Sequence, residues 1–187
     1  CFDMAGSGIT LNLRNNNFAN WTGTQTGTPF HAVITTFTTA STIASSTSEI
    51  NYNNLYVANP ANGFVARVNT TNHATIAAYD GGVTSPASND ANSISVDPGF
   101  FGNAVDLHAY GSSINGVGGS TTTTPAITAL PWAANDFDGQ ARQNPPDMGA
   151  DEFTPPSCLP PSGTTITALT SSSATFNWTN TGALSYD

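Results

Sequence analysis

The sequence predicts an all-β chain, and three observations support this fold class. Short runs of alternating apolar and polar residues recur along the chain, and Asn, Gly, Pro and Ser separate them. No window shows the sustained apolar spacing of a capped amphipathic helix. A hydrophobic content of 38%, with ten Phe, five Tyr and three Trp, supplies material for a core and argues against a disordered chain.

The expected strands follow from these runs. In the first run, Ile9, Leu11 and Leu13 alternate with polar residues and are expected to face inward. The remaining runs show similar patterns between turn residues. The strand-length runs are 8–18, 31–37, 49–58, 63–69 and 74–80, with two more at 164–169 and 173–179.

Paired Asn residues suggest a repeat. The stretches RNNNF (14–18) and YNNLYV (52–57) both place paired Asn before an aromatic or aliphatic residue. In a parallel β-solenoid, Asn side chains at equivalent turns stack into hydrogen-bonded ladders. The distance from Asn16 to Asn53 exceeds the ~20–29 residues of a plain short repeat. Either a further rung at 31–37 lies between them, or the Thr-rich stretch 35–48 is an insertion or an edge strand.

The chain divides into three parts. Residues 1–153 form the first domain, in which turn signals dominate from about residue 85 and 120–132 is expected to be an exposed loop. The Pro-rich stretch 154–163 is expected to be an extended linker. Residues 164–187 hold only two clear strands, too few to bury a core, so they are expected to be part of a larger module.

A motif near the end of the first domain resembles the C-terminal end of secreted right-handed parallel β-helix repeat proteins of bacteria. The stretches SVDPGFFGNAVDLHAYGSSINGVG and NDFDGQARQNPPDMGADEF carry this resemblance, with Asn115 where that family commonly has Asp and with an insertion at 119–131. The resemblance implies a right-handed parallel β-helix (solenoid) end with a C-terminal cap. The matching residues are Asp97, Pro98, Phe100, Asp106, Leu107, His108, Ser113, Ile114, Asn115, Gly118, Asp136, Asp138, Gly139, Arg142, Pro146, Asp147, Met148, Gly149, Ala150 and Glu152.

The final stretch is similar to the opening of a fibronectin type III β-sandwich, here incomplete. Trp178 would be the core aromatic residue of its second strand, and Tyr186 would start the third. A β-helix followed by such a module resembles large surface proteins of Bacteroidetes-type bacteria, many of which leave the cell by type IX secretion. The two cysteines, Cys1 and Cys158, do not make a disulfide framework. Because the chain opens without Met, we expect a start within a longer chain.

The net negative charge of the chain argues against nucleic acids and anionic membranes as partners. The chain has no Lys and three Arg against 12 acidic residues, a net charge of −9. It therefore lacks the basic residues that neutralise nucleic-acid phosphates or an anionic membrane surface. No segment approaches the ~20 apolar residues of a membrane helix, so no membrane insertion is expected.

An acidic cluster between residues 136 and 152 is the main candidate site. Twelve acidic and three basic residues make 15 charged side chains, and six of them lie here. The favoured interpretation is a structural cap, in which carboxylates accept backbone N–H bonds in tight turns and Arg pairs with a carboxylate. The expected cap residues are Asp136, Asp138, Arg142, Asp147 and Glu152.

Two alternatives exist for this cluster. Asp136 and Asp138 form an Asp-x-Asp-Gly stretch similar to a calcium loop, although the later ligands are missing. Paired-carboxylate glycosidase chemistry is the other alternative. The three histidines, His31, His73 and His108, share no zinc-ligand spacing, and His108 is expected to pack or to bond within a turn.

The expected function is that of a secreted or surface-displayed structural or adhesive protein, with glycans, other surface proteins or secretion machinery as partners. We predict no catalytic or cofactor-binding residues in this segment. One alternative is a carbohydrate-active enzyme, a polysaccharide lyase or glycoside hydrolase, with its catalytic rungs upstream of Cys1. Another is a filament spacer or a secretion cargo.

Overall fold

The computed structural model describes residues 2–4, 12–21, 31–36, 49–61, 63–68, 70–80, 90–102, 106–119, 134–157 and 162–179. The chain separates into two compact units, Cys1–Thr154 and Pro155–Asp187. Several expectations fall outside the described residues: the Thr-rich stretch beyond residue 36, the loop at 120–132, both cysteines and Tyr186.

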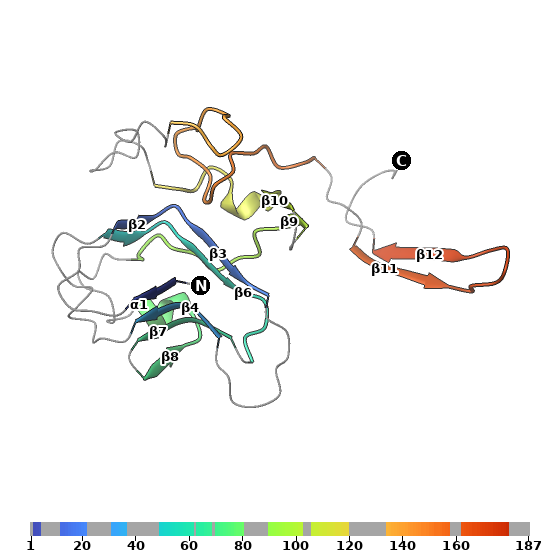
Figure 1. Cartoon of the computed structure of the whole chain (residues 1–187), viewed down its shortest axis with the longest axis horizontal. Coiled ribbons are helices and arrows are strands. Elements are labelled where there is room, and N and C mark those ends of the chain that lie inside the picture. The colour runs from blue at the N-terminus through green and yellow to red at the C-terminus, as the bar shows by residue number, and fades with distance from the viewer. Residues whose placement is uncertain are drawn as a thin grey trace. The chain divides into compact units, whose positions relative to one another are not determined.

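The all-β prediction is confirmed, because strands account for nearly all regular structure of the described residues (Figure 1). One short α-helix and one 3₁₀ turn are the exceptions among these residues. The elements are β1 (Phe2–Met4), β2 (Asn12–Arg14), β3 (Asn17–Asn20), β4 (His31–Thr36), β5 (Glu49–Asn51), β6 (Asn54–Val57), β7 (Gly63–Val68), β8 (Thr71–His73), α1 (Ile76–Asp80), β9 (Phe100–Gly102), β10 (Asp106–Ala109), η2 (Ser112–Ile114), β11 (Ser162–Thr167) and β12 (Thr175–Thr179).

The strands β1 to β7 pair in parallel at regular spacings, whereas β8 pairs antiparallel with β7. In the sheet β1-β4-β7-β8, Phe2 aligns with Ile34 and Ile34 with Ala66, so both steps are 32 residues (34 − 2 and 66 − 34). In the pairs β2–β5 and β3–β6 every step is 37 residues, as Phe18 aligns with Leu55 (55 − 18). Strands far apart in sequence, such as β3 and β6, therefore lie side by side (Figure 1).

These registers decide between the alternatives left open for the Asn repeat. Because β3 pairs directly with β6, no rung lies between the two Asn pairs. Residues 31–36 form β4, which belongs to another sheet. Thr36 and Glu49 are 13 residues apart, whereas the equivalent Met4 and Asn12 are 8 apart. The difference of five residues places an insertion between β4 and β5, within the Thr-rich stretch.

The expected Asn ladder is present. The Oδ1 atom of Asn53 accepts the backbone N–H of Asn16 and its side-chain Nδ2–H, both at 3.0 Å. One repeat later, Ser93 Oγ accepts the backbone N–H of Asn53 at 3.0 Å. In the neighbouring column, Asn54 Nδ2 donates to Asn17 Oδ1 at 3.0 Å. Asn53 and Asn54 are fully buried, and their ladder partners Asn16 and Asn17 are partly buried.

The same backbone turn recurs beside the ladder. Asn15, Tyr52 and Asp90 have φ values of 56°, 56° and 58°, in the left-handed region. They are 37 and 38 residues apart (52 − 15 and 90 − 52). A non-glycine residue adopts this conformation at a cost, so its recurrence at equivalent positions indicates that surrounding contacts fix the turn.

The run 74–80 was expected to be a strand, and this prediction is wrong. Residues Ile76–Asp80 form the helix α1. Thr75 Oγ1 accepts the backbone N–H of Ala78 at 3.2 Å, in the manner of a helix cap. Ile76 and Tyr79 are three residues apart, so they share one helix face and pack on the core cluster of Leu55, Val65, Ala66 and Val68.

A second hydrophobic cluster links the strands to the segment after residue 134. The buried side chains of Ala109, Ile114 and Met148 form its centre. Partly buried residues from the repeated strands and from the following segment surround them: Tyr52, Ile94, Val96, Phe100 and Phe153. The strands β9 and β10 are antiparallel, and η2 follows them directly.

The second unit is a two-stranded antiparallel hairpin of β11 and β12. All its described side chains from Gly163 to Thr179 are exposed, including Phe176 at 63% and Trp178 at 48%. Two strands thus leave their apolar side chains in water, as expected from the sequence. Among the described residues, no helix has the length and apolar character needed to cross a membrane.

Replacing Asn53 with alanine should destabilise the first unit. The change leaves the Asn16 amide and the Leu13 carbonyl, 2.9 Å from Asn53 Nδ2, without their partners. We expect the free energy of unfolding in urea to fall by about 3 kcal/mol. Asn92→Ala, at an exposed Asn, should change it by less than about 0.5 kcal/mol. Equal effects of the two substitutions would contradict a structural role for the ladder.

Candidate functional site: the acidic segment and the His108 group

The acidic segment, residues 134–154, is anchored by backbone hydrogen bonds to η2, to the loop that follows η2 and to the turn after β2. Met148 N–H donates to the Ile114 carbonyl at 3.0 Å, and Gly118 N–H donates to the Pro146 carbonyl at 2.8 Å. Gly149 N–H donates to the carbonyl of Asn15, at the left-handed turn, also at 2.8 Å. The segment is drawn in orange tones in Figure 1, next to η2 and β10.

Asp136 organises the first turn of this segment. Its Oδ1 atom accepts the backbone N–H groups of Asp138 at 3.0 Å and Gln140 at 2.7 Å. Its Oδ2 atom accepts the backbone N–H of Glu152 at 3.0 Å. Burial acts to raise the pKa of Asp136, but these three N–H donors, with Arg142 nearby, outweigh it and lower the pKa below its ordinary value.

Asp147 and Glu152 act in the same way on other turns. Asp147 Oδ1 accepts the N–H of Gly116 at 2.5 Å, and its Oδ2 accepts the N–H of Phe153 at 2.7 Å. Glu152 accepts the N–H groups of Gln143 at 3.0 Å and Asp147 at 3.1 Å. Both carboxylates are buried. Charge-assisted bonds of this kind are stronger than neutral ones, so they fix the loops firmly.

Arg142 neutralises part of this buried charge. Its guanidinium lies 3.5 Å from Glu152 Oε2 and also donates to the carbonyls of Gly149 and Ala150, both at 3.0 Å. The pairing of Arg142 with a carboxylate that the sequence suggested is therefore present. The same side chain holds three backbone or carboxylate oxygens of one loop, which a Lys with its single nitrogen would match less well.

Asp138 is placed differently from the other expected cap residues. Its carboxylate is 36% exposed, and Oδ2 lies 2.8 Å from Nε2 of His108. Nδ1 of His108 lies 2.5 Å from Oδ1 of Asp106. The hydrogen bond to Asp106, followed by that to Asp138, raises the pKa of His108 to about 9. The bond to His108 in turn lowers the pKa of Asp106.

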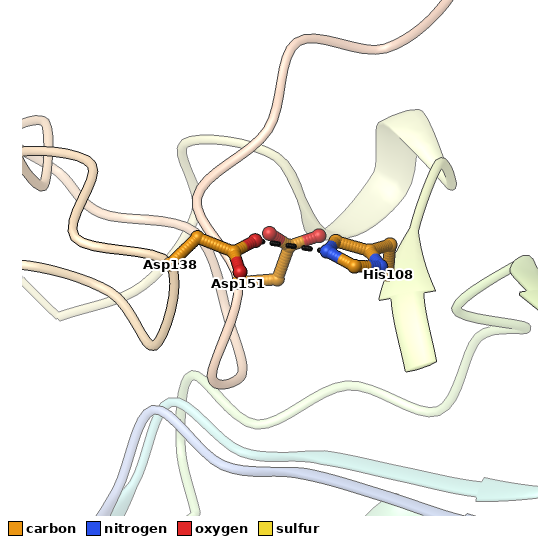
Figure 2. A group of neighbouring side chains, drawn as sticks. All are labelled: His108, Asp138 and Asp151. Carbon is orange, nitrogen blue, oxygen red and sulfur yellow. Dashed lines mark hydrogen bonds and ion pairs between the residues drawn. The ribbon is translucent and has the colours of Figure 1, made fainter. Parts of the chain in front are cut away.

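Asp151 completes this group. Its carboxylate is buried, and Oδ2 accepts the backbone N–H of Ala109 at 3.0 Å. One ligand atom each from His108, Asp138 and Asp151 lie within 4.8 Å of one another. Figure 2 shows the three side chains close together, with His108 on β10 and the two aspartates on different parts of the acidic segment. We call these three residues, with Asp106 behind the imidazole, the His108 group.

The two groups have different chemical capacities. Asp136, Asp147 and Glu152 bond to backbone N–H groups, so their oxygens serve the fold. Asp136 is therefore poorly placed for the calcium site considered with Asp138, and that site stays a prediction. The His108 group, by contrast, combines an imidazole and carboxylates at a partly exposed position, which is suited to holding a proton or a cation.

The sequence did not indicate the His108 group. His108 was expected only to pack or to bond within a turn, and Asp151 was noted only as a charge. One local signal was available: Asp106 and His108 are two residues apart on β10, so their side chains share one face of the strand. The approach of Asp138 and Asp151, 30 and 43 residues later, depends on the path of the acidic segment.

Asp136→Asn should destabilise the protein at pH 7 by about 2 kcal/mol, because an amide cannot serve all three N–H donors. Since the folded pKa of Asp136 is lowered, its stabilisation is complete above the ordinary pKa and is lost as the pH falls through the lower folded pKa. The difference between the variant and the original protein in urea unfolding should therefore shrink below about pH 4. A pH-independent difference, or an equal loss in the exposed-site control Asp97→Asn, would argue against this role.

The imidazole of His108 should titrate near pH 9 in the metal-free protein, measured by NMR in the presence of a chelator. Because this pKa is raised, the stabilisation is complete below about 6.5 and is lost as the pH rises through about 9. Asp138→Asn should lower the measured pKa, since one of two carboxylate partners is lost, whereas Asp97→Asn should leave it unchanged. A pKa near the ordinary 6.5 would show that the contacts with Asp106 and Asp138 do not hold in solution.

Comparison with protein-family models, with curated protein sequences and with solved structures finds no significant match to this chain.

Proposed function

We propose that the first unit is the C-terminal end of a right-handed parallel β-helix in a secreted or surface-displayed structural or adhesive protein. The observation that carries this proposal is the parallel pairing of strands at constant steps of 32 and 37 residues. Stacked strands of this kind form a rigid rod with long exposed faces. The buried ladder of Asn16, Asn53 and Ser93 is the side-chain stacking that such a rod uses at its turns.

The acidic segment is the cap of this rod in our proposal. A final repeat leaves backbone edges and apolar side chains open to water unless another segment covers them. Met148 covers Ile114 in the second hydrophobic cluster. The carboxylates of Asp136, Asp147 and Glu152 bond to the N–H groups of the covering loops. In this proposal the acidic segment therefore covers the apolar side chains of the second hydrophobic cluster.

The hairpin of the second unit is, in the same proposal, the opening of a fibronectin type III module. Ile166 aligns with Phe176 across the hairpin, and Trp178 is two residues further along β12. These three apolar side chains share one face and are exposed. One apolar face is what a single sheet of a sandwich presents to its partner sheet.

A group of aromatic residues on β6, on β9 and just after β3 favours a glycan as the contact partner. Trp21, at the end of β3, lies 5.7 Å from the ring of Tyr56 and 5.3 Å from that of Phe100. The hydroxyl of Tyr56 lies 3.3 Å from Asp97, which is exposed. Aromatic rings stack on the C–H faces of sugars, and an adjacent carboxylate and hydroxyl bond to sugar hydroxyls. We call Trp21, Tyr56 and Phe100 the aromatic group.

Retention of the protein by polysaccharides in affinity gel electrophoresis tests this function. At least one neutral polysaccharide should retard the protein, and Trp21→Ala should abolish the retardation. Trp178→Ala removes an exposed Trp of the second unit and should leave the retardation intact. Absence of retardation across a broad panel, or equal behaviour of the two variants, would reject glycan contact through the aromatic group.

A further inference from the structure

We propose that the His108 group is a binding site for one divalent transition-metal ion, with Zn²⁺ as the representative. The ligands are Nε2 of His108 and one carboxylate oxygen each from Asp138 and Asp151, which lie within 4.8 Å of one another. This site is distinct from the calcium pair considered from the sequence. It does not depend on the glycan contact.

The imidazole is oriented for coordination. Asp106 Oδ1 lies 2.5 Å from Nδ1 of His108, which places the Nδ1 proton on the Asp106 side and leaves Nε2 facing Asp138. The same oxygen accepts the backbone N–H of His108 at 3.1 Å, so Asp106 is itself held in place. A carboxylate behind a metal-binding His fixes its tautomer and increases its basicity. Asp106 is thus a positioning residue of the site.

The net negative charge of the His108 group favours the binding of a cation. Asp106, Asp138 and Asp151 contribute three negative charges, and a protonated His108 contributes one positive charge. Asp151 is only 6% exposed, yet within the described part of the chain its carboxylate has one hydrogen bond, from Ala109 N–H, and no ion pair. Three carboxylates and one protonated imidazole leave a net charge of −2, which a bound cation would offset. An ion between Asp138 and Asp151 would supply the missing charge.

The donor set selects the kind of ion. Calcium takes six to eight oxygen ligands, and magnesium keeps mostly water and carboxylate oxygens, so neither suits an imidazole nitrogen. Nitrogen and carboxylate donors together suit zinc and its neighbours among the transition metals. Three protein ligands also leave a fourth position for water or for a group of a partner molecule.

Hydrogen bonds to the backbone hold both carboxylate ligands in place. Asp138 lies in the turn that Asp136 holds through two N–H bonds, and Asp151 is fixed by Ala109 of β10. Nε2 of His108 and Oδ2 of Asp138 lie 2.8 Å apart, close enough to share a proton when the imidazole is charged. Binding replaces that proton with the metal, because an imidazole must be unprotonated to coordinate.

The test is titration of the chelator-treated full chain with Zn²⁺, followed by calorimetry and by ¹⁵N spectra of the histidine rings. We expect one saturable site of the His108 group, seen as a shift of the Nε2 resonance of His108. His108→Ala and Asp138→Asn each change a partly exposed side chain and should weaken this binding at least roughly tenfold. Asp97→Asn removes the same charge from an exposed Asp outside the group and should leave the affinity unchanged.

Two results would overturn the site. If Zn²⁺ leaves the His108 Nε2 resonance in place, any heat of binding arises from other groups, such as His73 or the cysteines. If the affinity is the same in Asp138→Asn as in the original protein, the carboxylate is not a ligand. Asp106→Asn provides a graded check, because loss of a positioning carboxylate should weaken binding about 10- to 100-fold without removing the Nε2 shift.

Discussion

Buried backbone N–H groups must find acceptors, and in this protein side-chain oxygens supply many of the acceptors that strand pairing cannot. At the repeated turn, the strand ladder is interrupted and the amides of Asn16 and Asn53 point to Asn53 Oδ1 and Ser93 Oγ. In the acidic segment, where there are almost no strands, Asp136, Asp147 and Glu152 take over the same task with charged oxygens. Neutral side-chain oxygens thus accept backbone N–H bonds at the repeats, and carboxylate oxygens accept them in the irregular loops.

This constraint also separates two kinds of acidic residue. The buried carboxylates that bond to N–H groups have little capacity left for chemistry, whereas Asp138 and Asp106 are partly exposed and contact an imidazole. Asp151 belongs to both kinds, since one oxygen serves the Ala109 amide while the side chain also faces the His108 group. Asn15 connects the two regions, because its carbonyl and its Oδ1 atom accept N–H groups of Gly149 and Gly119.

Much of the local structure could be predicted from the sequence, and much of the candidate site could not. Alternation located the strands β4 to β7, and the paired Asn predicted the ladder, because both depend on neighbouring residues. The run 74–80 was mistaken for a strand because a five-residue helix has too few turns to show its period. The hydrogen bond from the Ala78 N–H to Thr75 Oγ1 is a helix-capping contact that the alternation pattern did not reveal. The His108 group joins residues 30 and 43 positions apart through a segment with no regular structure, so neither spacing nor alternation could reveal it.

The turn between β2 and β3 has a consequence for how such a chain can change in length. The paired residues of β2 with β5 and of β3 with β6 are all 37 positions apart. One residue added or deleted at Asn15 or Tyr52 would therefore shift β3 or β6 out of register with its partner. Five extra residues between Thr36 and Glu49 leave both flanking strands in register. We therefore expect inserted residues to disturb the fold less between β4 and β5 than at the turn between β2 and β3.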